Sequence, residues 1–304
     1  VGQFSGDPNA LAAVGSTGNL TSLIVNLLFG LSAGTSVIVA RSYGARDKNA
    51  ISRAVHTSML FSIIGGVVVM VVGLSVCRFG LVLMGTKADV LESAVLYMSI
   101  ILCGAPASSI FNFSAAIIRA TGDSKTPFYI LATTGVVNIL FNLLFVIVFH
   151  MGVAGVAVAT IIAQYISAVW AVLILMRTKE DFHLSLRKLR IDGQMFRQIL
   201  LIGVPSSIQS SLFAISNILI QSSINTFTTP EVSGSTIAGT LESYAYMSGN
   251  CFYTAVITFV GQNLGAGKHE RVHDAIDTLY TAIVVGIVPL TILAILLIHP
   301  LLGL

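Results

Sequence analysis

Eight long segments of this chain carry almost no charge and are separated by short polar turns. Each is at least about as long as the roughly 20 helical residues that cross a bilayer core. Only 10% of the residues are charged, against about 25% in soluble domains, so lipid must be the solvent. We therefore expect an all-α, polytopic membrane protein. The expected spans are residues 12–40, 50–76, 90–118, 126–149, 152–176, 196–225, 233–262 and 272–298.

The lysine and arginine residues are unequally divided between the two sides of such a helix array. With eight alternating spans, 14 of the 16 fall on one side, and the exceptions, Arg78 and Lys87, share one loop. Basic loops stay on the cytoplasmic side of a membrane. This asymmetry predicts a multi-pass protein of the plasma (inner) membrane whose basic loops face the cytoplasm.

The only long polar stretch, residues 178–195, divides five spans from three. It predicts an N-terminal lobe over residues 1–177, a cytoplasmic linker over 178–195 and a partial C-terminal lobe over 196–304. A solvated linker that also touches anionic lipid is favoured over a regulatory site, because the stretch is rich in lysine and arginine.

Two similar turns lie 221 residues apart, each between two apolar segments. The first reads Val-Ala-Arg-Ser-Tyr-Gly-Ala-Arg-Asp-Lys over residues 39–48, and the second reads Val-Gly-Gln-Asn-Leu-Gly-Ala-Gly-Lys-His over 260–269. Gly44 and Gly265 are expected to permit a tight turn and close helix contact. Six spans separate the turns, so the two lobes are predicted to be parallel repeats. Eight of an expected twelve membrane helices would then be present, without the first helix and the last three.

One carboxylate lies deep within a predicted span. Glu242 is about ten residues into the span 233–262, whereas the other acidic residues lie in loops or near span ends. An intramembrane carboxylate is costly unless it is paired, hydrated or protonated. Glu242 is therefore a candidate for ion coupling or substrate binding, with a hydrogen-bonded carboxyl at a helix interface as the equally weighted alternative.

Neutral polar side chains recur at helical spacing in several spans. The sixth span carries a stripe at Ser206, Ser210, Asn217, Gln221 and Asn225, with Gln209 beside it. Further amides occur at Asn19, Asn26, Asn138, Asn142 and Gln164. Such faces either line a wet cavity or join helices by hydrogen bonds. Because several helices repeat the pattern, cavity lining is favoured for the amides, and such a lining suits amphipathic substrates of varied structure.

Four segments together resemble the multidrug and toxic compound extrusion (MATE) transporters. They are residues 10–15, the two glycine turns, residues 118–127 (Ile-Arg-Ala-Thr-Gly-Asp-Ser-Lys-Thr-Pro) and residues 152–160. The resemblance implies two six-helix lobes around a central cavity and export of amphipathic, often cationic, small molecules in exchange for Na⁺ or H⁺. One branch of the family has a glutamate near the position of Phe213, so this chain departs from that branch.

Two other functions fit parts of the sequence less well. A flippase for lipid-linked oligosaccharides in the same superfamily would be expected to have a basic cavity, and away from their cytoplasmic ends the spans lack basic residues. The motif His269-Glu270-Arg271-Val272-His273 matches that of zinc proteases, but it lies at a charged helix start without a convincing third ligand. We therefore expect no enzymatic activity, no cofactor besides the coupling ion, no nucleic-acid partner, and a monomer in the lipid bilayer.

Overall fold

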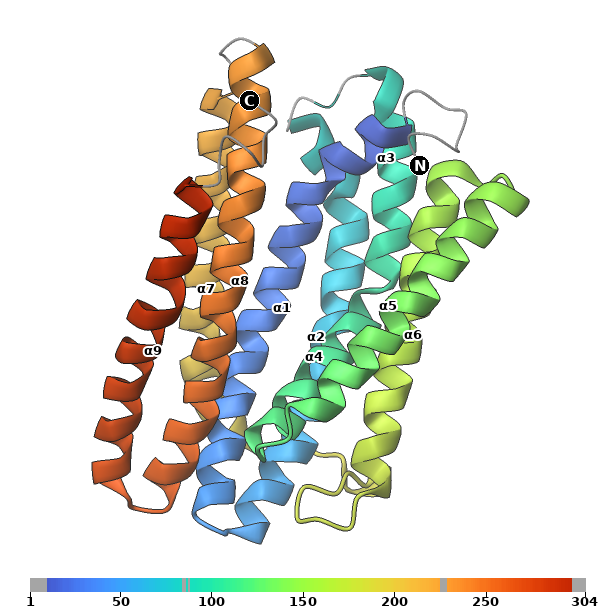
Figure 1. Ribbon diagram of the computed structural model, residues 1–304. Coiled ribbons are helices and arrows are strands. Elements are labelled where there is room, and N and C mark those ends of the chain that lie inside the picture. Colours follow the sequence, from blue (N-terminus) through green and yellow to red (C-terminus); the bar gives the residue numbers. More distant parts are fainter. Residues whose placement is uncertain (1–9, 84–85, 87, 225–228, 297–304) are drawn as a thin grey trace. The chain divides into compact units, whose positions relative to one another are not determined.

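The computed structural model describes the backbone of residues 10–83, 86, 88–224 and 229–296, and this part of the chain is helical without strands. Each of the eight expected spans coincides with a helical segment. The helices are α1 (Ala10–Gly44), α2 (Lys48–Leu83), α3 (Ala88–Cys103), α4 (Ala105–Ala120), α5 (Lys125–Leu143), α6 (Gly152–Arg177), α7 (Gly193–Ile224), α8 (Thr229–Gly265) and α9 (His269–Leu296) (Figure 1).

Length and hydropathy make this a polytopic membrane protein. Among the described residues, five helices are long and apolar enough to cross a bilayer, and the bent pair α3–α4 supplies a sixth candidate span. Valine, leucine and phenylalanine side chains on these helices remain exposed in the isolated chain. Lipid is the solvent that such surfaces require.

The third predicted span is broken into two helices. α3 and α4 meet at Gly104 with a bend of 43°. Pro106 has no N–H and so cannot continue the helical ladder. Gly104 N–H instead donates to the Ile101 carbonyl at 2.9 Å, and the Tyr165 hydroxyl donates to the Cys103 carbonyl at 3.1 Å. The kink predicted at Pro106 is confirmed as a complete break.

The chain divides into two compact units. The first comprises Val1–Val39 and Lys48–Ile215, and the second comprises Ala40–Asp47 and Ser216–Leu304. This division follows packing within the described chain, and the lobe boundary at residues 178–195 stays a prediction.

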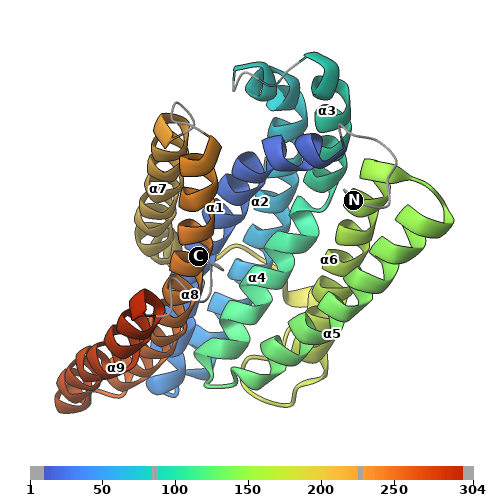
Figure 2. The same ribbon diagram turned by 45° about the horizontal axis from the view of Figure 1, so that its top comes forward.

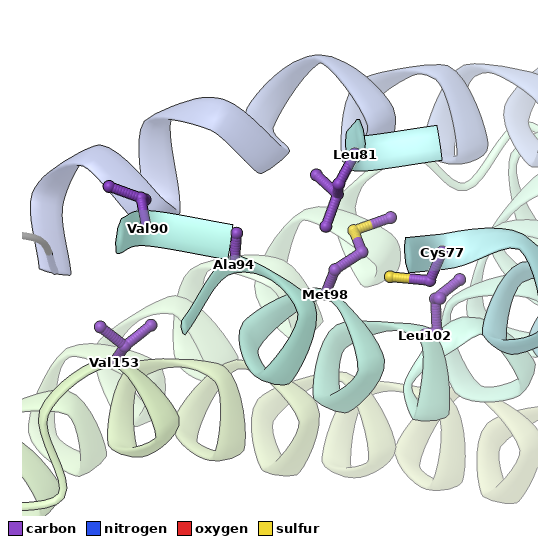
Figure 3. Close-up of a cluster of buried hydrophobic side chains, with 7 residues drawn as sticks. All are labelled: Cys77, Leu81, Val90, Ala94, Met98, Leu102 and Val153. Carbon is purple, nitrogen blue, oxygen red and sulfur yellow. The ribbon is translucent and has the colours of Figure 1, made fainter. Parts of the chain in front are cut away.

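A cluster of apolar side chains joins three helices of the first unit (Figure 3). Apolar residues recur every four positions along α3, so they share one helix face. The cluster consists of Cys77 and Leu81 from α2, Val90, Ala94, Met98 and Leu102 from α3, and Val153 from α6. This packing fixes α3 against both α2 and α6 on one side of the break.

Small residues bring α1 and α7 into backbone contact in the first unit. A Cβ built on Gly30 would lie 2.5 Å from the Cα of Ser207. The Ser207 hydroxyl donates to the Leu27 carbonyl at 3.0 Å. Close approach at small residues is the usual way in which membrane helices gain van der Waals contact.

In the second unit, α8 and α9 run side by side (Figure 2). The turn between them repeats the geometry of the turn that ends α1. Lys268 N–H donates to the Asn263 carbonyl and Gly267 N–H to the Leu264 carbonyl. These two bonds, with Gly267 at a φ of 70°, form a Schellman cap at the end of α8. The glycine that permits the tight turn is therefore Gly267, and Gly265 provides the expected close helix contact, because a Cβ there would overlap the Arg41 carbonyl oxygen.

Candidate functional site

A cluster of neutral polar side chains joins α5 to α6. We call Asn138, Asn142 and Thr160 the amide cluster. Asn142 Nδ2 donates to Asn138 Oδ1 at 2.9 Å, and Asn138 Nδ2 lies 3.4 Å from Thr160 Oγ1. The two asparagines are four residues apart on α5, so their side chains share one face of the helix.

The hydrogen bonds of the amide cluster all point in one direction. Each amide nitrogen donates to the next oxygen, and the Thr160 hydroxyl donates to the Val156 carbonyl at 2.9 Å. The oxygen at the head of this chain, Asn142 Oδ1, is buried and has no hydrogen-bond partner in the described structure. The amide cluster therefore presents an unused acceptor.

The helix changes its geometry directly after the amide cluster. α5 ends at Leu143, and residues Leu144–Val148 form a π-helical turn. Phe141 and Phe145 stack with ring centroids 5.6 Å apart. π-Turns interrupt the regular hydrogen-bond ladder and occur frequently at functional sites. This turn was not predicted, because nothing in the apolar run Leu-Phe-Val-Ile-Val distinguishes it from an α-helix.

A second buried acceptor faces the break between α3 and α4. Gln164 Oε1, on α6, is buried and lacks a hydrogen-bond partner within the described residues. It lies so close to Gly104 that a Cβ at that position would overlap it. Gln164 also lines a cavity of about 30 Å³, which is large enough for a water molecule. Thr21 and Ser108 supply the other polar side chains of this cavity, whose remaining walls are Ile24, Val25, Leu28, Ile101, Leu102 and Ala105.

These two amide oxygens limit the chemistry of the site. A buried acceptor without a donor costs about 1–3 kcal/mol, which a ligand that supplies a donor or a small cation would recover. Neither the amide cluster nor the cavity at Gln164 contains a charged side chain. The arrangement therefore suits ligands that carry N–H groups or positive charge.

Comparison with known proteins identifies the family. The profile of one protein family, described as MatE, matches residues 1–144 and 205–304. This chain belongs to the MatE family. A probable multidrug resistance protein of Bacillus subtilis, YoeA, is 30% identical over 283 residues, covering 91% of this chain and 61% of that protein. Another from the same organism, YpnP, is 30% identical over 271 residues, covering 86% and 58%.

A solved structure shares the fold of this MatE chain. The crystal structure of MATE in the straight conformation superposes with a TM-score of 0.85 at 23% sequence identity, covering 96% of this chain and 65% of that chain. The resemblance to MATE transporters drawn from the sequence is thus confirmed, as is the polytopic all-α fold. The chain spans about three fifths of the length of the relatives that it matches.

The remaining predicted site residues lie on α1 and α7 or outside the described residues. Asn26 on α1 is half-buried, and Gln209 on α7 is exposed; both belong to the first unit. Asn217 on α7 is exposed and belongs to the second unit. The side chains of Asn19, Gln221 and Glu242 lie outside the described residues, so their roles stay predictions, as does that of Asn225.

Sequence reasoning overlooked Thr160 as a member of the site. It lies four residues before Gln164 on α6, so the spacing already placed both on one helix face. Threonine is common at membrane helix interfaces, and nothing else in its sequence context singled it out. A second contact between these helices, the Ser167 hydroxyl with Thr134 Oγ1 at 2.9 Å, was overlooked for the same reason.

The zinc-protease motif does not form a metal centre in the described part of the chain. His269 and His273 are both exposed at the start of α9. Among the described residues, no group of three histidine, cysteine, aspartate or glutamate side chains is placed to hold a metal ion. The MatE family consists of membrane transporters, and the motif is better explained as the polar start of a helix.

Proposed function

We propose that this MatE chain belongs to a secondary active efflux antiporter that exports amphipathic, cationic small molecules. Two relatives support this proposal, because YoeA and YpnP are both described as probable multidrug resistance proteins. Family membership makes transport the activity to be explained. The polar residues of the first unit then indicate what kind of solute the transporter accepts.

The observation that carries the substrate assignment is the buried, unpartnered oxygen Asn142 Oδ1. An acceptor at the head of a hydrogen-bonded chain is polarised by the bonds behind it. It would receive an N–H group of an amphipathic cation, while Phe141 and Phe145, stacked at 5.6 Å on the same helix, offer apolar surface. Gln164 Oε1 would serve as a second acceptor. A neutral lining binds weakly enough to release its cargo and reads no single chemical group.

Export would be coupled to inward movement of Na⁺ or H⁺. In this proposal, Glu242 holds the coupling ion or substrate, because a carboxylate deep in a span is retained for function by default. The amides Asn217, Gln221, Gln209, Asn19 and Asn26 would line the rest of the pathway. Two parallel lobes, divided at residues 178–195, would rock to expose the cavity alternately to each side.

The proposed setting is a monomer in the plasma (inner) membrane, with the basic loops and linker in the cytoplasm. The placement of lysine and arginine supports this orientation. An amphipathic cation would then enter from the cytoplasm or the inner leaflet and leave on the opposite side. The coupling ion would move inward down its gradient.

Efflux by the intact transporter in proteoliposomes tests this function. A fluorescent cationic dye is loaded inside, and Na⁺ and pH gradients are imposed separately. Dye efflux that accelerates under one gradient and stops when it is dissipated is the expected result. Failure of both gradients to drive efflux, together with flipping of a labelled lipid-linked oligosaccharide, would overturn the assignment. Wild-type efflux by a Glu242→Gln variant would remove only the role of that residue.

A further inference from the structure

The linker between α6 and α7 is held against the start of α2 by two buried side chains. We call residues 178–192 the linker loop. His56, which is 3% exposed, accepts the backbone N–H of Ser185 at Nε2 over 3.1 Å. Its other ring nitrogen, Nδ1, lies 2.6 Å from the Ser52 carbonyl. Because both ring nitrogens have hydrogen-bond partners, the orientation of the imidazole is fixed.

Thr57 holds the far side of the same loop. Its hydroxyl accepts the backbone N–H of Asp192 at 3.0 Å and lies 3.4 Å from the Arg190 carbonyl. Thr57 is fully buried, and Leu184 is buried before the turn. Hydrogen bonds to His56 and Thr57 therefore hold both ends of the segment from Ser185 to Arg190, which fixes the course of the backbone between them.

The linker loop has three acidic residues, Glu180, Asp181 and Asp192, and the last two contact α2 or α7. Asp181 pairs with Lys48 at 3.1 Å, and Asp192 lies 3.5 Å from Arg53. Asp192 also accepts the Met195 N–H at 3.0 Å at the start of α7. That N–H, followed by Arg53, holds the pKa of Asp192 below its usual value despite partial desolvation. Asp181 and Asp192 are therefore paired with cations of α2 and not with the cations of the loop itself.

The exposed side chains of residues 186–191 are both basic and apolar. Leu186 is 56% exposed and Ile191 is 45% exposed, although both lie in a polar loop. Arg187, Lys188 and Arg190 lie among them and are exposed, and within the described residues none has a carboxylate partner. We call these five residues the basic face. Exposed leucine and isoleucine among cations are typical of segments that lie at a membrane interface.

We propose that the basic face is a docking surface for anionic lipid headgroups at the edge of the bilayer. The linker loop directly follows one membrane-crossing helix and precedes another, which keeps it within reach of the lipid surface. The cations would pair with phosphates, and the two apolar side chains would enter the headgroup region. Because His56 and Thr57 pre-order the loop, little conformational entropy remains to be lost on binding. This inference does not depend on the transported substrate.

Native mass spectrometry of the intact transporter, titrated with phosphatidylglycerol and separately with phosphatidylcholine, tests the proposal. The wild-type protein is expected to retain phosphatidylglycerol preferentially. The triple variant Arg187→Gln, Lys188→Gln and Arg190→Gln should bind it about tenfold more weakly. The matched control, Arg46→Gln, Lys268→Gln and Arg271→Gln, removes the same charge from the glycine turns and should change the affinity less than twofold.

A third variant tests whether lipid binding needs the fixed conformation of the linker loop or only its positive charge. Thr57→Val keeps every cation and the shape of the side chain but removes both hydrogen bonds to the linker loop. Phosphatidylglycerol affinity should fall at least twofold while phosphatidylcholine binding stays unchanged. Equal losses in the two triple variants, or no preference for phosphatidylglycerol in the wild type, would overturn the proposal. An unchanged affinity in Thr57→Val would also contradict the proposal, because lipid binding would then not depend on a fixed conformation of the linker loop.

Discussion

Gly44 and Gly265 pack reciprocally, each against the backbone of the other turn. A Cβ on Gly44 would overlap the carbonyl oxygen of Gln262, and a Cβ on Gly265 would overlap that of Arg41. Gly265 lies 221 residues after Gly44, and Gln262 lies 221 residues after Arg41. Such an exchange of contacts is what a two-fold relation between repeats produces.

The same separation relates the hydrogen bonds of the two turns. Asp47 N–H donates to the Ser42 carbonyl at 3.2 Å, as Lys268 N–H does to Asn263 at 2.9 Å. The left-handed residue is Arg46 in the first turn, at a φ of 56°, and Gly267 in the second. The two turns thus share their backbone geometry at the predicted repeat spacing, although few side chains recur. This supports the proposed pair of parallel lobes.

Adding a methyl group at either reciprocal glycine should loosen this contact. Gly44→Ala and Gly265→Ala should each destabilise the protein by about 1–3 kcal/mol, because backbone atoms must move apart. Thermal unfolding of the intact transporter measures the change. Gly65→Ala in α2, where a Cβ would meet no atom within 4 Å, is the control and should be neutral or stabilising. A loss at Gly65 as large as that at Gly44 would contradict the reciprocal packing.

Substitutions at the two left-handed positions should have opposite signs. Gly267→Ala should destabilise the protein by about 1–2 kcal/mol, because an L side chain is strained there. Arg46→Gly should relieve the same strain and stabilise the first turn by a smaller amount, since glycine costs more entropy on folding. Differential scanning fluorimetry of both variants measures the shifts. Two shifts of the same sign would contradict the shared cap geometry.

How far the sequence predicts this structure depends on the kind of feature. The helices follow from long apolar runs, and the break near Pro106 follows from its missing N–H. The close contact of Gly44 was expected from its small size, whereas the left-handed conformation of Arg46 could not be predicted, because arginine rarely adopts it. The partners of Asn142 and Gln164 also required the structure, since helical spacing places residues on a face without showing which helix they contact.

The contact between Gly104 and Gln164 should appear as an energetic coupling. Gly104→Ala alone would push the flexible end of the Gln164 side chain away from the break and should destabilise the protein by at most about 1 kcal/mol, at the low end of overpacking costs. In a Gln164→Ala background the same change should cost much less, because the overlapping oxygen is gone. Thermal unfolding of the four proteins in this double-mutant cycle gives the coupling. Additive effects would mean that the two residues do not touch.

The start of α5 should lose stability in acid. Burial tends to raise the pKa of Asp123, but hydrogen bonds from Thr126 and Lys125 outweigh it and the net pKa is lowered. A depressed pKa contributes stability above the unfolded value of about 3.9 that is lost as the pH falls through the folded value. Asp123→Ala should cost about 0.5–2 kcal/mol at neutral pH, with a smaller difference from wild type below about pH 4.

Unfolding of wild type and Asp123→Ala across this pH range measures the effect. Asp123→Asn keeps an acceptor oxygen but cannot titrate, so its stability relative to Asp123→Ala should not depend on pH. A difference between wild type and Asp123→Ala that stays constant down to about pH 3, well below the unfolded pKa, would show that the carboxylate does not stabilise α5.

The most direct test of the account concerns the acceptor at the head of the amide cluster. Two cationic dyes are compared in proteoliposomes: ethidium, which carries N–H donors, and tetraphenylphosphonium, which carries none. Replacing Asn142 by leucine removes this acceptor at similar volume, together with the N–H that donates to Asn138 Oδ1. The ratio of efflux efficiencies for the two dyes should fall about fivefold, the equivalent of one hydrogen bond.

The measurement is therefore the ethidium-to-tetraphenylphosphonium efflux ratio in the wild type, in Asn142→Leu and in the control Ser109→Ala. Ser109 is also buried without a partner but lies outside the amide cluster. The ratio should be lower in Asn142→Leu alone, with tetraphenylphosphonium efflux retained. An unchanged ratio in Asn142→Leu, with both dyes still exported, would contradict the claim that this buried oxygen receives the substrate.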